Sequence, residues 1–288
     1  MFQTAVITDE VSQDFQVAVD FALRHKLDAV EIRSVDEKNP FEMNQVDIDK
    51  MKAILKGTGL KVCCISAPFF KCDIDNKQEI EEHIEGLKRC IHIAKELGCS
   101  LIRGFTFWNK GDFEQSISDI VKKFQEPIVL LKQANMLLAL EFDPTVYTTN
   151  AKRAVMVLKE LNSPYVKALW DPGNDIYDEE EECPYPDGYE MIKPYLVHMH
   201  LKDAKRVNGK PEAMIIGKGD FDFVGQFKAL LNDGYQGYVS LETHYRPAHE
   251  LSEEILKQPK GSTFSYLGLE ASEECMKNWK DIMKKCNV

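Results

Sequence analysis

The sequence predicts an α/β fold made of a single (β/α)8 barrel. Short apolar runs alternate with longer amphipathic stretches from one end of the chain to the other, and eight such runs occur in 288 residues. No Pro- or Ser-rich linker divides the chain, and barrels of this kind commonly reach about 250 residues as one domain. We therefore expect one domain over residues 1–288, with a helical C-terminal extension from about residue 245.

The eight apolar runs are the predicted strands of the barrel. Each run is too short for a helix and is rich in Val, Ile and Leu, as strands buried on both faces are. The runs span residues 4–8, 28–32, 61–66, 100–105, 136–141, 166–171, 195–200 and 237–242.

The stretches between the strands carry helical signals. Apolar residues recur at helical spacing over residues 82–98 and 221–234, and a glycine closes each stretch. Asp220 or Asp222 is placed to cap the second of these helices. A doubly wound open sheet is the rival fold, but the G-x-G-x-x-G turn that it needs after the first strand is missing.

Composition narrows the possible partners. Lys and Arg number 36 against 47 Asp and Glu, which gives a net charge of −11. This balance, without any cluster of basic residues, argues against a nucleic-acid partner. No segment reaches the roughly 18 apolar residues of a membrane span, and the first residues lack an export signal. The eight cysteines show no framework spacing, so we expect reduced thiols in a cytoplasmic protein with no membrane partner.

Four consecutive predicted strands end in a side chain that can bind a metal. These residues are Glu141, Asp171, His200 and Glu242. Function in a barrel of this kind lies at the C-terminal ends of the strands, and three converging carboxylates would repel one another without a positive charge between them. Acidic residues also follow strands as ordinary helix caps, but all four together favour a divalent-cation site, because this donor set suits Mn²⁺, Mg²⁺, Co²⁺ or Zn²⁺.

The stretch HMHLKD contains two histidines that would share one face of a strand. His200 is level with the other three strand ends, whereas His198 lies deeper in the barrel. We therefore assign His200 to the metal. His198 is expected to be a neutral, hydrogen-bonded core histidine or to contact a ligating carboxylate.

The motifs LALEFDP, ALWDPGN, VHMHLKD, IGKGDFDF and GYVSLETH resemble those of the xylose isomerase-like sugar phosphate isomerase/epimerase superfamily of TIM barrels. That superfamily includes ketose 3-epimerases, hydroxypyruvate isomerases and inosose dehydratases. The resemblance implies that Glu141, Asp171, His200 and Glu242 bind one divalent ion, with Mn²⁺ the first expectation, and that the two glutamates are the catalytic acid/base pair. It also implies that Arg206 contacts substrate oxygens. Many members carry a histidine where this chain has Asn174.

These residues predict a metal-dependent isomerase or epimerase of a small keto-sugar or polyol-derived ketone. A chelated carbonyl makes the adjacent C–H acidic, and one glutamate removes that proton. Strand-end arginines can instead be ion-pair partners within the barrel. The predicted substrate-binding residues are Arg206, Lys202, Asn174, Arg103 and Glu31.

The sequence is also compatible with other functions. Loss of a hydroxyl at the same site would make the protein a dehydratase of an inosose-type substrate. An endonuclease IV-like nuclease would need extra histidines where the strand ends carry Glu31, Ser66 and Asn174, and a non-catalytic sugar-binding barrel is a further alternative. Two aspartates in the loop 216–223 favour an unphosphorylated substrate. We expect the amphipathic C-terminal segment to close the barrel base or to join a partner subunit in a homo-oligomer.

Overall fold

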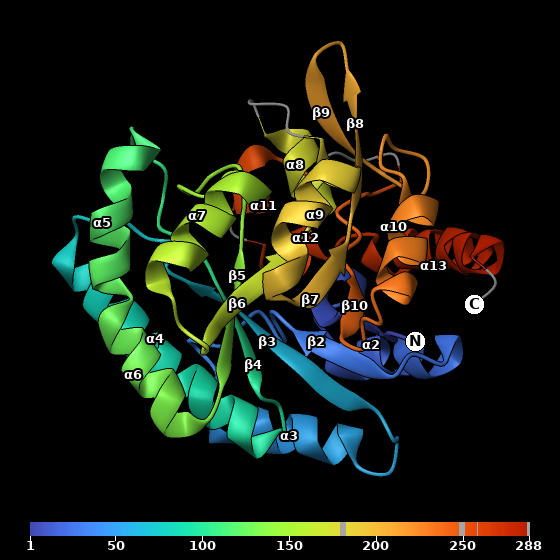
Figure 1. Ribbon diagram of the computed structural model, residues 1–288. Helices are drawn as coiled ribbons and strands as arrows, with labels where there is room; N and C mark the ends of the chain where they lie inside the picture. Colours follow the sequence, from blue (N-terminus) through green and yellow to red (C-terminus); the bar gives the residue numbers. More distant parts are fainter. Residues whose placement is uncertain (179–182, 248–250, 258, 287–288) are drawn as a thin grey trace.

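The computed structural model describes residues 1–178, 183–247, 251–257 and 259–286, and it confirms the predicted barrel (Figure 1). Eight parallel strands close in the order β1-β10-β7-β6-β5-β4-β3-β2. The strands are β1 (Gln3–Ile7), β2 (Ala29–Ile32), β3 (Lys61–Phe69), β4 (Leu101–Gly104), β5 (Leu137–Glu141), β6 (Val166–Trp170), β7 (Leu196–Leu201) and β10 (Tyr238–Leu241).

All eight predicted strands are present, and β3 alone runs well past its predicted end. Most residues of these strands are buried, because helices cover the outside while side chains fill the barrel. Closure occurs where β1 pairs with β10, with Ala5 level with Ser240. The alternation of apolar runs and helices in the sequence therefore predicted the fold class correctly.

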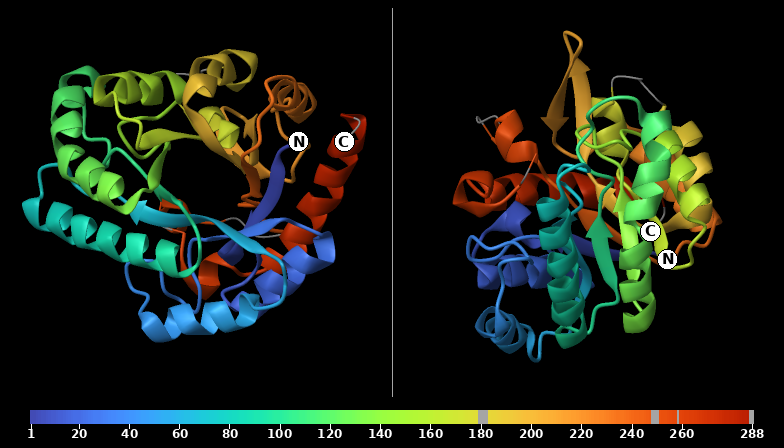
Figure 2. Two further views of the ribbon diagram at one scale, coloured as in Figure 1. Left: turned by 60° about the horizontal axis from the view of Figure 1, so that its bottom comes forward. Right: turned by 90° about the vertical axis from the view of Figure 1, so that its left-hand side faces the viewer.

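Helices surround the strands (Figure 2). Those that precede β10 are α1 (Thr8–Val11), α2 (Phe15–His25), α3 (Gln45–Leu55), α4 (Lys77–Glu96), α5 (Phe113–Lys123), α6 (Gln125–Ala134), α7 (Ala151–Leu161), α8 (Pro172–Tyr177), α9 (Tyr189–Ile192) and α10 (Phe223–Asn232). A π-helical turn, Pro184–Gly188, and a 3-10 turn, Lys193–Tyr195, flank α9.

The two helices expected from the sequence show the predicted stop signals. Helix α4 begins at Lys77, earlier than expected, because the Asn76 side chain accepts hydrogen bonds from the first backbone N–H groups. For α10 the capping residue is Asp222 rather than Asp220, since its side chain accepts from the Gly225 N–H. Gly98 follows α4 with φ of +69°, a left-handed conformation that favours glycine.

An antiparallel hairpin that the sequence analysis did not anticipate lies between β7 and α10. Strands β8 (Asp203–Val207) and β9 (Lys210–Met214) pair with each other alone and project from the barrel (Figures 1 and 2). Asn208 and Gly209 connect them with φ of 52° and 81°, the conformation that an Asn-Gly hairpin turn requires. The Asn-Gly pair was the available signal, but polar flanking residues masked the strand pattern.

The segment after β10 contains α11 (Glu253–Lys257), α12 (Gly261–Phe264) and α13 (Gly268–Lys285). Helix α13 lies beside the N-terminal elements (Figure 2), and Glu273 accepts a 2.8 Å hydrogen bond from His25 on α2. The expectation of one domain over residues 1–288 stays a prediction. Among the described residues, no helix has the length and apolar character to cross a membrane.

Helix α13 approaches the N-terminal segment so closely that its first residue must be small. A Cβ atom on Gly268 would lie 2.3 Å from the Glu10 carbonyl oxygen and 3.0 Å from that of Val11. Both atoms belong to the backbone and cannot swing away. We expect Gly268→Ala to lower the free energy of unfolding by about 1–3 kcal/mol, the usual cost of overpacking, as measured by urea denaturation.

Gly111→Ala is the matched control, because a Cβ atom at Gly111 would have nothing within 4 Å. We expect that variant to unfold at the wild-type denaturant concentration. Equal stability of the Gly268 and Gly111 variants would contradict the close approach of α13.

Candidate active site at the barrel mouth

The four strand-end residues predicted from the sequence come together at one point. Their potential ligand atoms all lie within 4.8 Å of one another, and none of the four side chains is more than 3% exposed. Glu141 is the last residue of β5, His200 lies in β7, and Asp171 and Glu242 directly follow β6 and β10. These strands are consecutive in the barrel, so the convergence follows from the topology.

The D-P-G turn sets the orientation of Asp171. Its Oδ1 atom caps α8 by accepting hydrogen bonds of 2.9 Å from the Gly173 N–H and 3.3 Å from the Asn174 N–H. Oδ2 is then left facing the centre of the cluster, 2.6 Å from the Lys202 ammonium. Glycine is required at 173, because a Cβ atom would lie 2.9 Å from the Lys202 carbonyl oxygen.

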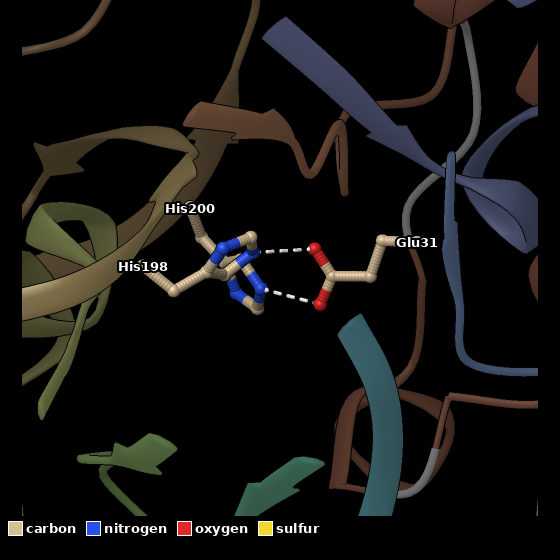
Figure 3. A group of neighbouring side chains, drawn as sticks. All are labelled: Glu31, His198 and His200. Atoms are coloured by element: carbon tan, nitrogen blue, oxygen red, sulfur yellow. Dashed lines mark hydrogen bonds and ion pairs between the residues drawn. The ribbon is translucent and has the colours of Figure 1, made fainter. Parts of the chain in front are cut away.

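His200 uses its two ring nitrogens differently. Its Nε2 atom is 3.0 Å from Glu31 Oε1 (Figure 3), whereas Nδ1 faces Glu141 Oε1 at 3.3 Å and Glu242 Oε2 at 3.4 Å. His198 lies deeper, and its Nε2 atom is 2.7 Å from Glu31 Oε2. His198 is thus hydrogen-bonded in the core, and its carboxylate partner is Glu31 rather than one of the four clustered residues.

Protein cations balance part of the negative charge. Arg103 lies 3.2 Å from Glu141, and Arg33 lies 2.6 Å from Glu242. The Lys202 ammonium also lies 3.1 Å from Glu242. The strand-end arginines therefore do act as ion-pair partners within the barrel.

The ionisation of the cluster reflects this crowding. Burial opposes ionisation of Glu242, but Lys202, His244 and His200 outweigh it and hold the pKa of Glu242 well below its ordinary value. Burial also raises the pKa of Glu141, but the positive charge of Arg103 is the main effect that lowers it, and the net shift is downward. Asp171 differs, because burial outweighs Lys202 and raises its pKa to about 8.

Neighbouring carboxylates also shift the pKa of His200. Burial lowers the pKa of its imidazole, but the carboxylates of Glu31 and Glu141 outweigh burial and raise that pKa well above the ordinary value. The raised pKa values of Asp171 and His200 thus favour the protonated forms of these two groups at neutral pH.

A divalent ion fits this donor set. Asp171 Oδ2, Glu141 Oε2 and His200 Nδ1 are buried and make no hydrogen bond within the described part of the chain, although each lies near an opposite charge. Three carboxylates and one imidazole suit Mn²⁺, Co²⁺ or Zn²⁺. The cluster therefore has the composition and the open ligand atoms that a metal centre needs.

The structure brings four of the five predicted substrate-binding residues to the cluster. Asn174 Nδ2 lies 3.3 Å from Glu141 Oε1, and its Oδ1 accepts a 2.8 Å hydrogen bond from Lys202. Arg103, Lys202 and Glu31 also contact clustered residues. Arg206 lies on the β8–β9 hairpin, where its guanidinium donates to the carbonyl oxygens of Asp178 and Gly209.

A second charged group, which the sequence analysis did not predict, lies beside the cluster. Asp9 and Glu10 follow β1, and both accept hydrogen bonds from Arg33, which in turn holds Glu242. His244 Nε2 lies 3.4 Å from both Glu10 and Glu242. The acidic pair directly after the first strand was the available signal, but its spacing matches no familiar motif.

The loop after the hairpin uses two of its backbone amides to bind a carboxylate of the protein itself. The backbone N–H groups of Gly217 and Gly219 donate hydrogen bonds of 2.8 and 2.9 Å to Asp203 Oδ2. A Cβ atom at Gly219 would lie 2.2 Å from Asp203. The amide groups that suit a phosphate in such a loop are thus already bound to a carboxylate.

Comparison with known proteins agrees with this geometry. A protein-family model described as a xylose isomerase-like TIM barrel matches residues 19–260. The L-ribulose-5-phosphate 3-epimerase UlaE of Shigella flexneri serotype 5b is 22% identical over 239 residues, which cover 78% of this chain and 80% of that protein. An inosose dehydratase of Clostridium perfringens is 31% identical over 121 residues, covering 36% and 38% of the two chains.

Among solved structures, a D-allulose 3-epimerase from Methylomonas sp. in complex with D-allulose has a TM-score of 0.73 at 17% identity, covering 99% of this chain and 97% of that chain. Likeness at this identity establishes the fold. The expectations of a cytoplasmic location, of a homo-oligomer and of no nucleic-acid partner stay predictions.

The raised pKa of Asp171 predicts a pH dependence of metal binding. Its pKa of about 8 in the folded protein exceeds the roughly 3.9 of an unfolded aspartate, so the metal-free fold loses stability as pH rises between these values. A cation must displace this proton. We expect saturating Mn²⁺ to raise the melting temperature more at pH 8 than at pH 6, as measured by thermal unfolding.

Asp171→Asn is the control for this experiment, because it removes the displaced proton together with one ligand. Its Mn²⁺-induced shift should be smaller and should vary less with pH. A wild-type shift that is the same at both pH values would argue against the proton on Asp171.

Proposed function

This chain belongs to the xylose isomerase-like TIM barrel family, and from that premise we propose that it is a divalent-metal-dependent isomerase or epimerase of a small, unphosphorylated keto-sugar or polyol-derived ketone. The observation that carries the proposal is the buried convergence of Glu141, Asp171, His200 and Glu242 at the C-terminal ends of consecutive strands.

One divalent ion is the proposed cofactor, with Mn²⁺ preferred and Mg²⁺, Co²⁺ or Zn²⁺ as alternatives. Glu141, Asp171, His200 and Glu242 would hold it. When bound, such an ion acts as a Lewis acid that polarises a carbonyl oxygen and makes the neighbouring C–H more acidic.

Glu141 and Glu242 are the proposed acid/base pair. Glu141 ends β5 and Glu242 directly follows β10, with β6 and β7 between these strands in the barrel. The two carboxylates would therefore reach a bound ligand from separate strands. Both have a lowered pKa, so each is ionised at neutral pH and can accept a proton from carbon. For epimerisation, one glutamate would take the proton from carbon, and the other, after taking a proton from solvent, would return it to the opposite face.

Lys202 and Asn174 are the proposed contacts for substrate oxygens. The Lys202 ammonium and the Asn174 amide lie between Glu141 and Glu242, with 2.8 Å between Lys202 Nζ and Asn174 Oδ1. Both groups donate hydrogen bonds. The 3-epimerases of L-ribulose 5-phosphate and D-allulose that resemble this chain support a ketose as the ligand.

A metal-dependent dehydratase of an inosose-type substrate is the second candidate. The 31% identity to an inosose dehydratase over 121 residues favours it, and the same centre supports loss of a hydroxyl after proton removal. A nuclease of the endonuclease IV type is disfavoured, because Glu31 and Ser66 hydrogen-bond each other and Asn174 bonds Glu141. A non-catalytic sugar-binding barrel would use the same residues without turnover.

Metal content tests the proposal directly. We expect about one divalent ion per purified chain by elemental mass spectrometry, because the four ligands surround one position. Glu242→Gln should reduce that content and abolish epimerisation of ketoses, since it removes a negative ligand and the proposed base. Glu270→Gln, an exposed change on α13, is the control and should behave like the wild type.

Two or three zinc ions per chain would favour the nuclease alternative. Absence of bound metal, even after incubation with Mn²⁺ or Co²⁺, would refute the ligand assignment. One ion per chain without turnover of ketoses or inososes would favour the sugar-binding barrel.

Substrate phosphorylation is tested by comparing free L-ribulose with L-ribulose 5-phosphate. The Gly217 and Gly219 amides are bound to Asp203 Oδ2. A phosphate that took these amides would leave that buried oxygen without its two donors. We expect kcat/KM for the free ketose to exceed that for its phosphate at least about 10-fold, equivalent to about 1.4 kcal/mol. A preference for the phosphate would show that the anion binds elsewhere at the mouth.

A further inference from the structure

We propose that Glu31 is a positioning residue of the metal centre: its carboxylate fixes His200 in the tautomer that leaves Nδ1 open for the ion. This inference rests on the metal site of the proposed function but not on any particular reaction. It gives Glu31 a role different from the substrate contact expected from the sequence.

The argument begins with the chemistry of the contact. A carboxylate accepts hydrogen bonds from the donors that surround it. The Ser66 hydroxyl and the rings of His198 and His200 all meet the Glu31 oxygens. The 3.0 Å contact from His200 Nε2 to Glu31 Oε1 therefore requires a proton on Nε2. In neutral His200 the lone pair must then lie on Nδ1, the atom that faces Glu141 and Glu242.

The position of Glu31 is itself strongly determined. Its strand β2 is separated from β7 by β1 and β10, so the side chain reaches across the barrel interior. His198 donates to Oε2 at 2.7 Å, and the Ser66 hydroxyl donates to Oε1. Figure 3 shows the carboxylate facing both imidazoles, each held by one oxygen.

Burial favours positioning over direct substrate contact. Glu31, His198 and His200 are each 0% exposed, and both Glu31 oxygens already accept hydrogen bonds from the protein. Histidine ligands commonly donate their second ring N–H to a carboxylate, which orients the ring and raises its basicity. Here His198 and Ser66 hold that carboxylate in place.

Three features of this arrangement can be separated by substitution. Glu31→Met keeps the length of the side chain and removes both acceptors. Glu31→Gln removes the charge but keeps an amide oxygen that can accept the His200 Nε2–H. Val30→Ala is the matched control, because Val30 is a buried neighbour on β2 whose side chain points to the opposite face.

The readout is the dissociation constant for Mn²⁺, measured by isothermal titration calorimetry, together with the visible spectrum of the Co²⁺-loaded protein. We expect Glu31→Met to bind Mn²⁺ about 10- to 100-fold more weakly and to change the Co²⁺ spectrum. Glu31→Gln should stay within a few-fold of the wild type, and Val30→Ala should bind as the wild type does.

Wild-type affinity in Glu31→Met would overturn the proposal, and equal losses in the Met and Gln variants would assign the effect to charge rather than to orientation. If Glu31→Met does not fold, ¹⁵N NMR of the Zn²⁺-loaded wild type with labelled histidine decides. Protonation of His200 at Nε2 supports the proposal, and protonation at Nδ1 refutes it. A wild-type chain that binds metal without isomerase activity would refute the proposed reaction alone.

Discussion

The crowding of carboxylates in a buried place is the constraint on which the rest of the site depends. The barrel brings Glu141, Asp171 and Glu242 to one point, and each is at most 2% exposed. At low effective dielectric, like charges at this separation raise one another's energy strongly. The surroundings must therefore supply cations or protons, and the cluster has both.

The positively charged side chains around the cluster balance its negative charge only in part. Arg33, Arg103 and Lys202 each pair with a different carboxylate of the centre, as in an ordinary buried ion-pair network. A network complete in itself would leave its acids ionised. Asp171 instead has its pKa raised to about 8, because burial outweighs its lysine partner. This unmet demand for positive charge favours a cation site over a static network.

The sequence predicted the features that depend on local pattern. Buried strands show as apolar runs, so all eight strands and the four clustered residues at their ends could be predicted from residue order. Contacts between distant segments could not be predicted in this way. Glu31 meets His200 across the barrel. The residues next to either position in the sequence do not indicate that the two side chains lie in contact or which Glu31 oxygen accepts the hydrogen bond. The β8–β9 hairpin was missed because strands that pair only with each other need no apolar run.

The C-terminal segment contributes to the site, although none of its described residues belongs to the cluster of Glu141, Asp171, His200 and Glu242. Arg33 holds Glu242 at 2.6 Å, and its guanidinium lies 4.7 Å from the centre of the Phe264 ring on α12. Arg246 lies 4.9 Å from the same ring and pairs with Glu10, which also binds Arg33. One aromatic ring thus contacts two cations that share an acidic partner. Since Arg33 cannot shift without disturbing this arrangement, the position of Glu242 depends on how the last helices pack.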